Sequence, residues 1–181
     1  PTVSSEPAMS GGYQIGPDGV LVRPAEFAAD TYTKPELPEA AKENSERGAE
    51  AAAEHYLALL VYAWNTGDTQ PFADMSSPTS KFASDYINDV NEQYANGWSY
   101  GMESNITHVL RVEPIAANGD DVPEGSILVK FRTETDDGTS CTRTKLQSSS
   151  STYKSTVTFI MTWRDGGWKE VQGRTVGDNE G

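Results

Sequence analysis

The apolar residues of this chain change their spacing once, at Asn96-Gly97, and this change restricts the fold to helices followed by strands. Before it, apolar side chains recur three and four residues apart, which is typical of helices with one buried face. After it, apolar and polar residues alternate, which is typical of strands with one buried side. Because the helical runs come first, we predict an α+β fold in which N-terminal helices pack on a strongly curved antiparallel sheet.

The main helical run ends at Gly67, where a left-handed residue would close the last turn. Pro38 suits the first position of a helix because its nitrogen has no proton to leave unpaired. The sequence therefore predicts a long helix from Pro38 to Gly67. Its buried face is expected to consist of Ala49, Ala52, Ala53, Tyr56, Leu57, Leu60, Val61 and Trp64.

The stretch 64–86 is rich in Ser and Thr, which we interpret as helix caps. Asp68 is expected to cap a short helix, and Ser76 or Ser77 is expected to cap a third one. The stretch contains neither a GxSxG nor an SxxK motif, so a serine nucleophile is not favoured. Ser80 is expected to face solvent, and Ser80→Ala is expected to be nearly silent.

The alternating part predicts strands over 98–113, 126–136, 151–164 and 168–173. A DGG turn separates the last two and is a hairpin signal. The polar run 142–152 has two interpretations that the sequence leaves open, a ragged edge strand or a flexible connection.

The composition argues against several classes of partner. There are 27 acidic and 14 basic residues, and the net charge is −13. Such a surface repels nucleic-acid backbones and anionic lipids. No apolar stretch approaches the roughly 20 residues of a membrane helix, and Cys141 has no second cysteine to pair with. Because no metal-ligand or nucleotide motif is present, we expect neither a metal nor another cofactor.

Composition also predicts the domain organisation. Residues 1–35 are rich in Pro, Gly, Ser and acidic residues and are expected to form a flexible polar leash. Within them, residues 19–27 have a second interpretation, as a strand added to the domain. The domain itself is expected over 36–176, and a disordered tail over 177–181.

Two motifs carry a resemblance to known families. The helix ending in "WNTGD" and the hairpin "WRDGGWKEV" resemble the nuclear-transport-factor-2-like (cystatin-like) cone over residues 38–175. More narrowly, residues 40–87 together with "YANGW" resemble an actinobacterial lipoprotein family of unknown function. This resemblance implies secretion, a lipidated cysteine upstream of residue 1 and tethering to the outer face of the cytoplasmic membrane. It implies no activity.

The cone fold implies a single cavity between helices and sheet. The candidate cavity-lining residues are Tyr56, Trp64, Tyr86, Trp98, Tyr100 and His108. Among them only His108 is a plausible general base, and acid–base catalysis needs a second titratable group beside it. We therefore expect no catalytic residues, and a cavity that is small or filled by aromatic side chains.

Three classes of function remain. The leading one is a non-catalytic cell-envelope module that binds an unidentified envelope protein or a small apolar ligand. The second is a small-molecule isomerase- or dehydratase-like enzyme that uses His108 with a Tyr. The third is a structural module that forms a homodimer through its sheet. In each of them nucleic acid is excluded, and contact with a membrane runs only through a lipid anchor.

Overall fold

The computed structural model describes residues 6–178, in which helices precede an antiparallel sheet, as the sequence predicts. The helices are α1 (Glu46–Thr66), α2 (Gln70–Asp74) and α3 (Lys81–Asn96). The strands that follow are β3 (Gly97–Tyr100), β4 (Glu103–Pro114), β5 (Ile127–Asp136), β6 (Thr139–Thr142), β7 (Leu146–Ser148), β8 (Thr152–Arg164) and β9 (Gly167–Gly177). None of the helices in this described range is long and apolar enough to span a membrane.

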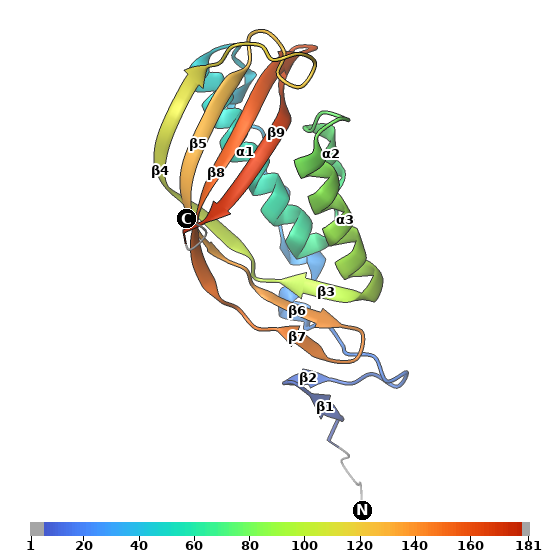
Figure 1. The fold of residues 1–181 in the computed structure, drawn as a ribbon. Coiled ribbons are helices and arrows are strands. Elements are labelled where there is room, and N and C mark those ends of the chain that lie inside the picture. Colours follow the sequence, from blue (N-terminus) through green and yellow to red (C-terminus); the bar gives the residue numbers. More distant parts are fainter. Residues whose placement is uncertain (1–5, 179–181) are drawn as a thin grey trace, which may run out of the picture.

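The strands form a four-stranded sheet in the order β4-β5-β8-β9 and a three-stranded sheet in the order β3-β6-β7. Figure 1 shows α1 and α3 on the same side of the larger sheet, with the smaller sheet continuing below their C-terminal ends. The α+β architecture with a curved sheet is therefore confirmed. The polar run 142–152 supplies β7, which is the edge strand of the smaller sheet.

The core lies between α1 and the larger sheet. The side chain of Tyr56 stacks on Phe72 with ring centroids 4.4 Å apart and meets Phe159 edge-on at 5.0 Å. Phe131 and Met161 are also fully buried there. These residues come from the apolar face of the helical run and from the alternating strands, which is the packing that the two periods predict.

The long helix begins later than the sequence predicts. Ser45 caps α1 by accepting a hydrogen bond from the Gly48 nitrogen at 3.0 Å, and Pro38 precedes only a short 3-10 turn, η3 (Glu39–Lys42). The chain folds back at Glu43, whose carbonyl would lie 1.9 Å from a Cβ at position 48. Gly48 permits this close approach. The C-terminal end at Gly67, with φ 79°, agrees with the prediction.

The cap of α3 is Ser80, not Ser76 or Ser77. The Ser80 hydroxyl accepts a hydrogen bond from the Ala83 nitrogen at 3.1 Å, and Ser80 is only 3% exposed. The expectation that Ser80 faces solvent is therefore wrong. Ser76 and Ser77 contact β9 through their backbone. Ser76 forms a bridge with Glu170, and the Ser77 nitrogen donates to the Glu170 carbonyl at 2.7 Å.

The single strand predicted over 98–113 is broken into two. Gly101, at φ 77°, separates β3 from β4, and the two strands join different sheets. Within β4, register shifts fall between Ile106 and His108 and between Val109 and Arg111. Each shift inserts a residue without a partner, so the alternation of faces slips along the strand.

The segment before α1 packs on the domain. It contains β1 (Met9–Ser10), β2 (Tyr13–Gln14), and the 3-10 turns η1 (Ala25–Phe27) and η2 (Ala29–Thr31). The buried Leu21 donates its backbone N–H to the Arg143 carbonyl at 2.7 Å, and Arg23 donates to the Asn65 carbonyl at 2.7 Å. Phe27 stacks on Tyr100 with ring centroids 4.2 Å apart.

The flexible-leash interpretation is thus wrong for this stretch. Residues 19–27 lie against the domain, but they form an isolated bridge at Leu21 and the turn η1, and not the added strand of the second interpretation. The C-terminal residues also contact the domain as far as Asp178, whose carboxylate accepts a hydrogen bond from Arg132 of β5 at 2.6 Å. The remaining parts of the predicted leash and tail, residues 1–5 and 179–181, lie outside the described residues.

Candidate functional site

A cavity of about 370 Å³ lies between α1, α3 and the two sheets. Its helix wall consists of Leu57, Leu60 and Trp64 from α1 and Tyr86 and Gln93 from α3. Its sheet wall is dominated by hydroxyl side chains, which are Ser99, Ser104, Thr133, Thr135, Ser140, Ser148, Ser155 and Thr175. The expectation of a small or aromatic-filled cavity is therefore wrong, because short Ser and Thr side chains on the sheet leave space that aromatic ones would have occupied.

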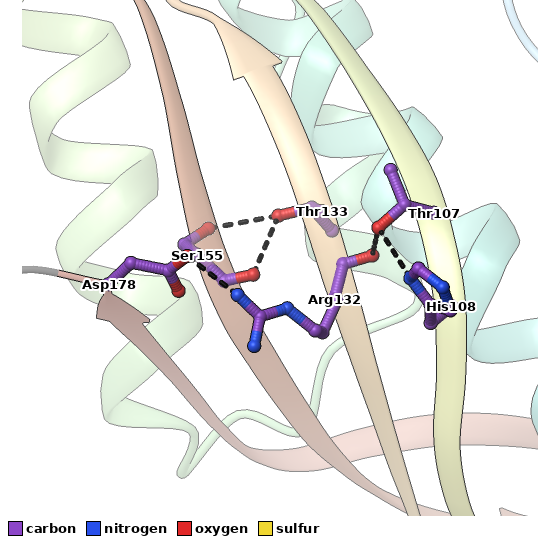
Figure 2. A network of polar contacts seen from close by, with 6 residues as sticks. All are labelled: Thr107, His108, Arg132, Thr133, Ser155 and Asp178. Atoms are coloured by element: carbon purple, nitrogen blue, oxygen red, sulfur yellow. Dashed lines mark hydrogen bonds and ion pairs between the residues drawn. The ribbon is translucent and has the colours of Figure 1, made fainter.

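The hydroxyls of the sheet wall pair across neighbouring strands. Thr133 and Ser155 are buried, and their hydroxyl oxygens are 2.9 Å apart. Figure 2 shows this pair bridging β5 and β8, while the neighbouring Arg132 extends to Asp178. Thr133 is also placed to donate to the Ser155 carbonyl, at 3.4 Å. Both protons of this pair are then used within the wall.

Two further pairs keep hydrogen-bonding capacity. The hydroxyl oxygens of Ser104 and Thr135 are 2.8 Å apart, and those of Ser140 and Ser148 are 2.7 Å apart. One hydroxyl of each pair donates to the other, so the second proton of each pair remains available. The cavity can therefore offer O–H donors to acceptor oxygens of a ligand.

The two ends of the cavity differ in exposure and polarity. Leu57, Leu60 and Val157 are buried, whereas Gln147 and Ser148 are exposed. The cavity thus has an apolar inner end and a polar rim.

The lining carries little charge. Among the described residues, no Lys, Arg or His lines this cavity, and its carboxylate is Asp137 at the rim. The oxygens of Asp137 accept hydrogen bonds from the Ser151 nitrogen at 2.8 Å and from the Ser151 hydroxyl at 3.1 Å. Burial raises the pKa of both Tyr86 and Tyr153, so these phenols stay neutral.

The structure separates the residues that the sequence grouped as cavity-lining. Trp64 and Tyr86 line the cavity. Tyr56 does not, because its ring packs in the core against Phe72 and Phe159. The helical period placed Tyr56 on the correct buried face of α1 but could not divide that face between core and cavity.

Trp98 and Tyr100 lie in a second cluster, beneath the N-terminal segment. They pack with Leu21, Tyr13 and the buried Cys141. The hydroxyl oxygens of Tyr13 and Tyr100 are 2.5 Å apart. The prediction that Trp98 and Tyr100 line the cavity is therefore wrong, because alternation along a strand does not show which distant segment covers its side chains.

His108 lies outside the cavity. The inserted Thr107 turns His108 outward, where it pairs with Arg132 and is exposed. Its Nδ1 is 3.2 Å from the Thr107 hydroxyl, and Figure 2 shows the two side chains next to each other on β4. The alternative in which His108 acts as a base inside the cavity is therefore wrong.

The buried acid Glu170 is not among the residues that the sequence predicts for a site. Glu170 is 0% exposed, and its carboxyl oxygens lie 2.8 Å from the Tyr56 hydroxyl and 2.9 Å from the Ser80 hydroxyl. Burial raises the pKa of Glu170, and the two hydrogen bonds oppose this only in part. Glu170 does not line the cavity. Its burial could have been predicted from the alternation of the strand. Glu170 follows Trp168 by two residues, so both side chains face the inside.

Comparisons with known proteins agree with this fold. A solved structure from Xanthomonas campestris, named for the calcium/calmodulin dependent protein kinase II association domain, has a TM-score of 0.50 and 17% identity over 83% of this chain and 97% of its own. A nuclear transport factor 2-like protein from Salmonella enterica has a TM-score of 0.48 and 11% identity over 74% and 93%. A ketosteroid isomerase-like protein from Erwinia carotovora atroseptica has a TM-score of 0.45 and 15% identity over 72% and 93%.

At these identities a solved structure describes the fold alone, and the match with a TM-score of 0.50 agrees with the helices and antiparallel sheet described above. No curated protein matches the sequence. A family model, however, matches residues 25–173, which include all of α1 to α3 and most of the sheet. The chain therefore belongs to the family of unknown function DUF6318.

Proposed function

We propose that this protein is a non-catalytic module that binds a small molecule in the cavity between α1, α3 and the sheets. The observation that carries the proposal is the space of about 370 Å³ with one apolar wall and one hydroxyl-bearing wall. Small-molecule sites in proteins are typically concave and largely apolar, with a few placed polar groups.

The charges around the cavity support binding without catalysis. Acid–base catalysis requires titratable groups within hydrogen-bond reach of the reacting atom, with pKa values pushed apart. Asp137 is held at the rim by Ser151, and the buried Glu170 is bonded to Tyr56 and Ser80 outside the cavity. Among the described residues, the other titratable groups that line the cavity are Tyr86 and Tyr153, and burial raises the pKa of both phenols, so neither is suited to act as a base beside Asp137.

The proposal also includes a location. The resemblance of residues 40–87 to actinobacterial lipoproteins supports a cell-envelope protein that a lipidated cysteine, upstream of residue 1, tethers to the outer face of the cytoplasmic membrane. Fractionation of the source cells, followed by detergent phase partition, is expected to recover the native protein with the membrane lipoproteins. Recovery in the cytoplasmic fraction would contradict this part of the proposal.

Binding is tested with N-phenyl-1-naphthylamine, an uncharged apolar dye that fluoresces when it leaves water. We expect saturable binding of one dye per chain. Ser104→Phe places a ring on the cavity wall and should weaken dye binding about tenfold or more. Asn105→Phe is the matched control, because Asn105 is the exposed next residue of β4.

Circular dichroism and thermal melting confirm that both variants fold. Equal dye affinity in folded Ser104→Phe and Asn105→Phe, or dye binding without saturation, would overturn the proposed binding site.

A further inference from the structure

We infer that the ligand of this cavity is a single uncharged amphiphile, with its apolar tail at the inner end and a hydroxyl-bearing head at the rim. This inference rests on the proposed function, and it adds the chemical class of the ligand and its orientation. A glycoside or an acylglycerol with one short chain has this chemistry, whereas a fatty acid or a phospholipid does not.

The orientation follows from the gradient of exposure along the cavity. Leu57, Leu60 and Val157 are buried at the inner end. The hydroxyls of Thr133 and Ser155 lie at this end too, but they use both of their protons on each other and on the Ser155 carbonyl. The inner end therefore offers mainly apolar contact, with one O–H proton left on the pair formed by Ser104 and the buried Thr135, and this suits a hydrocarbon chain.

The rim has the opposite character. The pair Ser140–Ser148 keeps one O–H donor, and the exposed Gln147 adds an amide that can both donate and accept. Asp137, beside them, accepts only. A head group with several hydroxyls satisfies this mixture, because each hydroxyl can donate to the carboxylate or accept from the serine and the amide.

The charge of the rim decides against acidic ligands. Asp137 is a carboxylate, and no cationic side chain among the described residues lines the cavity to balance it. Lys154 lines a groove outside the cavity, which it shares with Asp178. A carboxylate or phosphate head would thus lie beside a like charge without a counter-ion.

The same outer groove provides a way in. Tyr86, Tyr153 and Thr175 line both the cavity and this groove, so they stand at the boundary between the two. Tyr153 is 43% exposed. A chain entering between the two tyrosines would meet aromatic surface first and leave its head group beside the rim.

The test is displacement of N-phenyl-1-naphthylamine by three unlabelled compounds, each used as a monomer. Octyl β-D-glucoside carries the tail and a neutral head, sodium octanoate carries the tail and a charged head, and glucose is the head alone. We expect octyl glucoside to displace the dye at about tenfold lower concentration than octanoate, and glucose to leave it bound. Equal or stronger displacement by octanoate would overturn the inference, and so would displacement by glucose.

A double variant tests the rim. Ser140→Ala with Ser148→Ala removes the hydroxyl pair and should bring the concentration of octyl glucoside that displaces the dye close to that of octanoate, with both concentrations referred to the dye affinity measured for this variant. The matched control is Thr139→Ala with Ser149→Ala, since neither residue lines the cavity. If octyl glucoside still displaces the dye at about tenfold lower concentration than octanoate in the variant without the Ser140 and Ser148 hydroxyls, the assigned orientation is wrong. A dye that fails to bind the wild-type protein contradicts the proposed function itself, so the two failures are distinguishable.

Discussion

At the scale of single residues, the contacts of Glu170 determine its protonation state. Its carboxyl group lies within hydrogen-bond distance of the hydroxyls of Ser80 and Tyr56. The Tyr56 oxygen is also 2.7 Å from the Ser76 hydroxyl, which is 2.7 Å from the Phe72 carbonyl. These four contacts need four protons, and the three hydroxyls supply three. A protonated Glu170 would supply the fourth, in agreement with the burial that raises the pKa of this carboxyl group.

Glu170→Gln tests this assignment, because glutamine can donate to Tyr56 and accept from Ser80 at any pH. Burial raises the pKa of Glu170 above the unfolded value of about 4.3, so its contribution to stability is complete below that value and is lost as pH rises through the folded pKa. Relative to the variant, the wild-type free energy of unfolding should fall by up to about 1.4 kcal/mol per pH unit in that window. Urea unfolding of both proteins from pH 4 to 8 measures the difference. A constant difference would show that Glu170 has an ordinary pKa.

Ser80→Ala is expected to be costly, in contrast to the prediction made from sequence. The change removes the cap of α3 and leaves a buried carboxyl oxygen without its donor. Together these losses should lower the free energy of unfolding by roughly 2–3 kcal/mol. Ser84→Ala is the control, because Ser84 is exposed and bonds only to the Lys81 carbonyl. Urea unfolding curves that coincide for the two variants would show that Ser80 faces solvent, as the sequence predicts.

At the scale of elements, the N-terminal segment acts as a cover over the smaller sheet. Arg23 holds it to α1 by donating to the Asn65 carbonyl at 2.7 Å, and it also donates to the Phe27 carbonyl within the segment. Beneath it lies Cys141, fully buried, and burial raises the pKa of its thiol. Detachment of the segment would expose this thiol, so its reactivity reports on the cover.

Arg23→Ala should therefore increase the rate at which an aromatic disulfide reagent modifies Cys141, by tenfold or more, without unfolding the domain. Lys145→Ala is the control for loss of a nearby exposed charge. Circular dichroism establishes that the fold persists. An unchanged rate in folded Arg23→Ala would mean that the cover stays in place without the hydrogen bonds of Arg23.

At the scale of the whole molecule, the sequence predicted features that depend on local period and missed those that depend on distant partners. The change of period at Asn96-Gly97, the end of α1 at Gly67 and the last hairpin are local, and the structure has all three. The bulge at Thr107 reverses the face of every residue until the next one, so alternation could not place His108. The hydroxyl wall was missed because Ser and Thr alternate with charged residues as they would on a solvated face.

The cavity touches α1, α3 and both sheets, so its ligand should stabilise these elements as one unit. A ligand that binds only the folded chain adds about 2.7 kcal/mol to the free energy of unfolding at a concentration of 100 times its Kd. N-phenyl-1-naphthylamine at that concentration should raise the melting temperature by several degrees, equally in far-ultraviolet circular dichroism and in tryptophan fluorescence. Ser104→Phe should show a smaller shift and Asn105→Phe the wild-type shift. Different melting temperatures from the two measurements in the presence of dye would contradict a single unit. The helices and the sheet would then unfold independently, although they form the walls of one cavity.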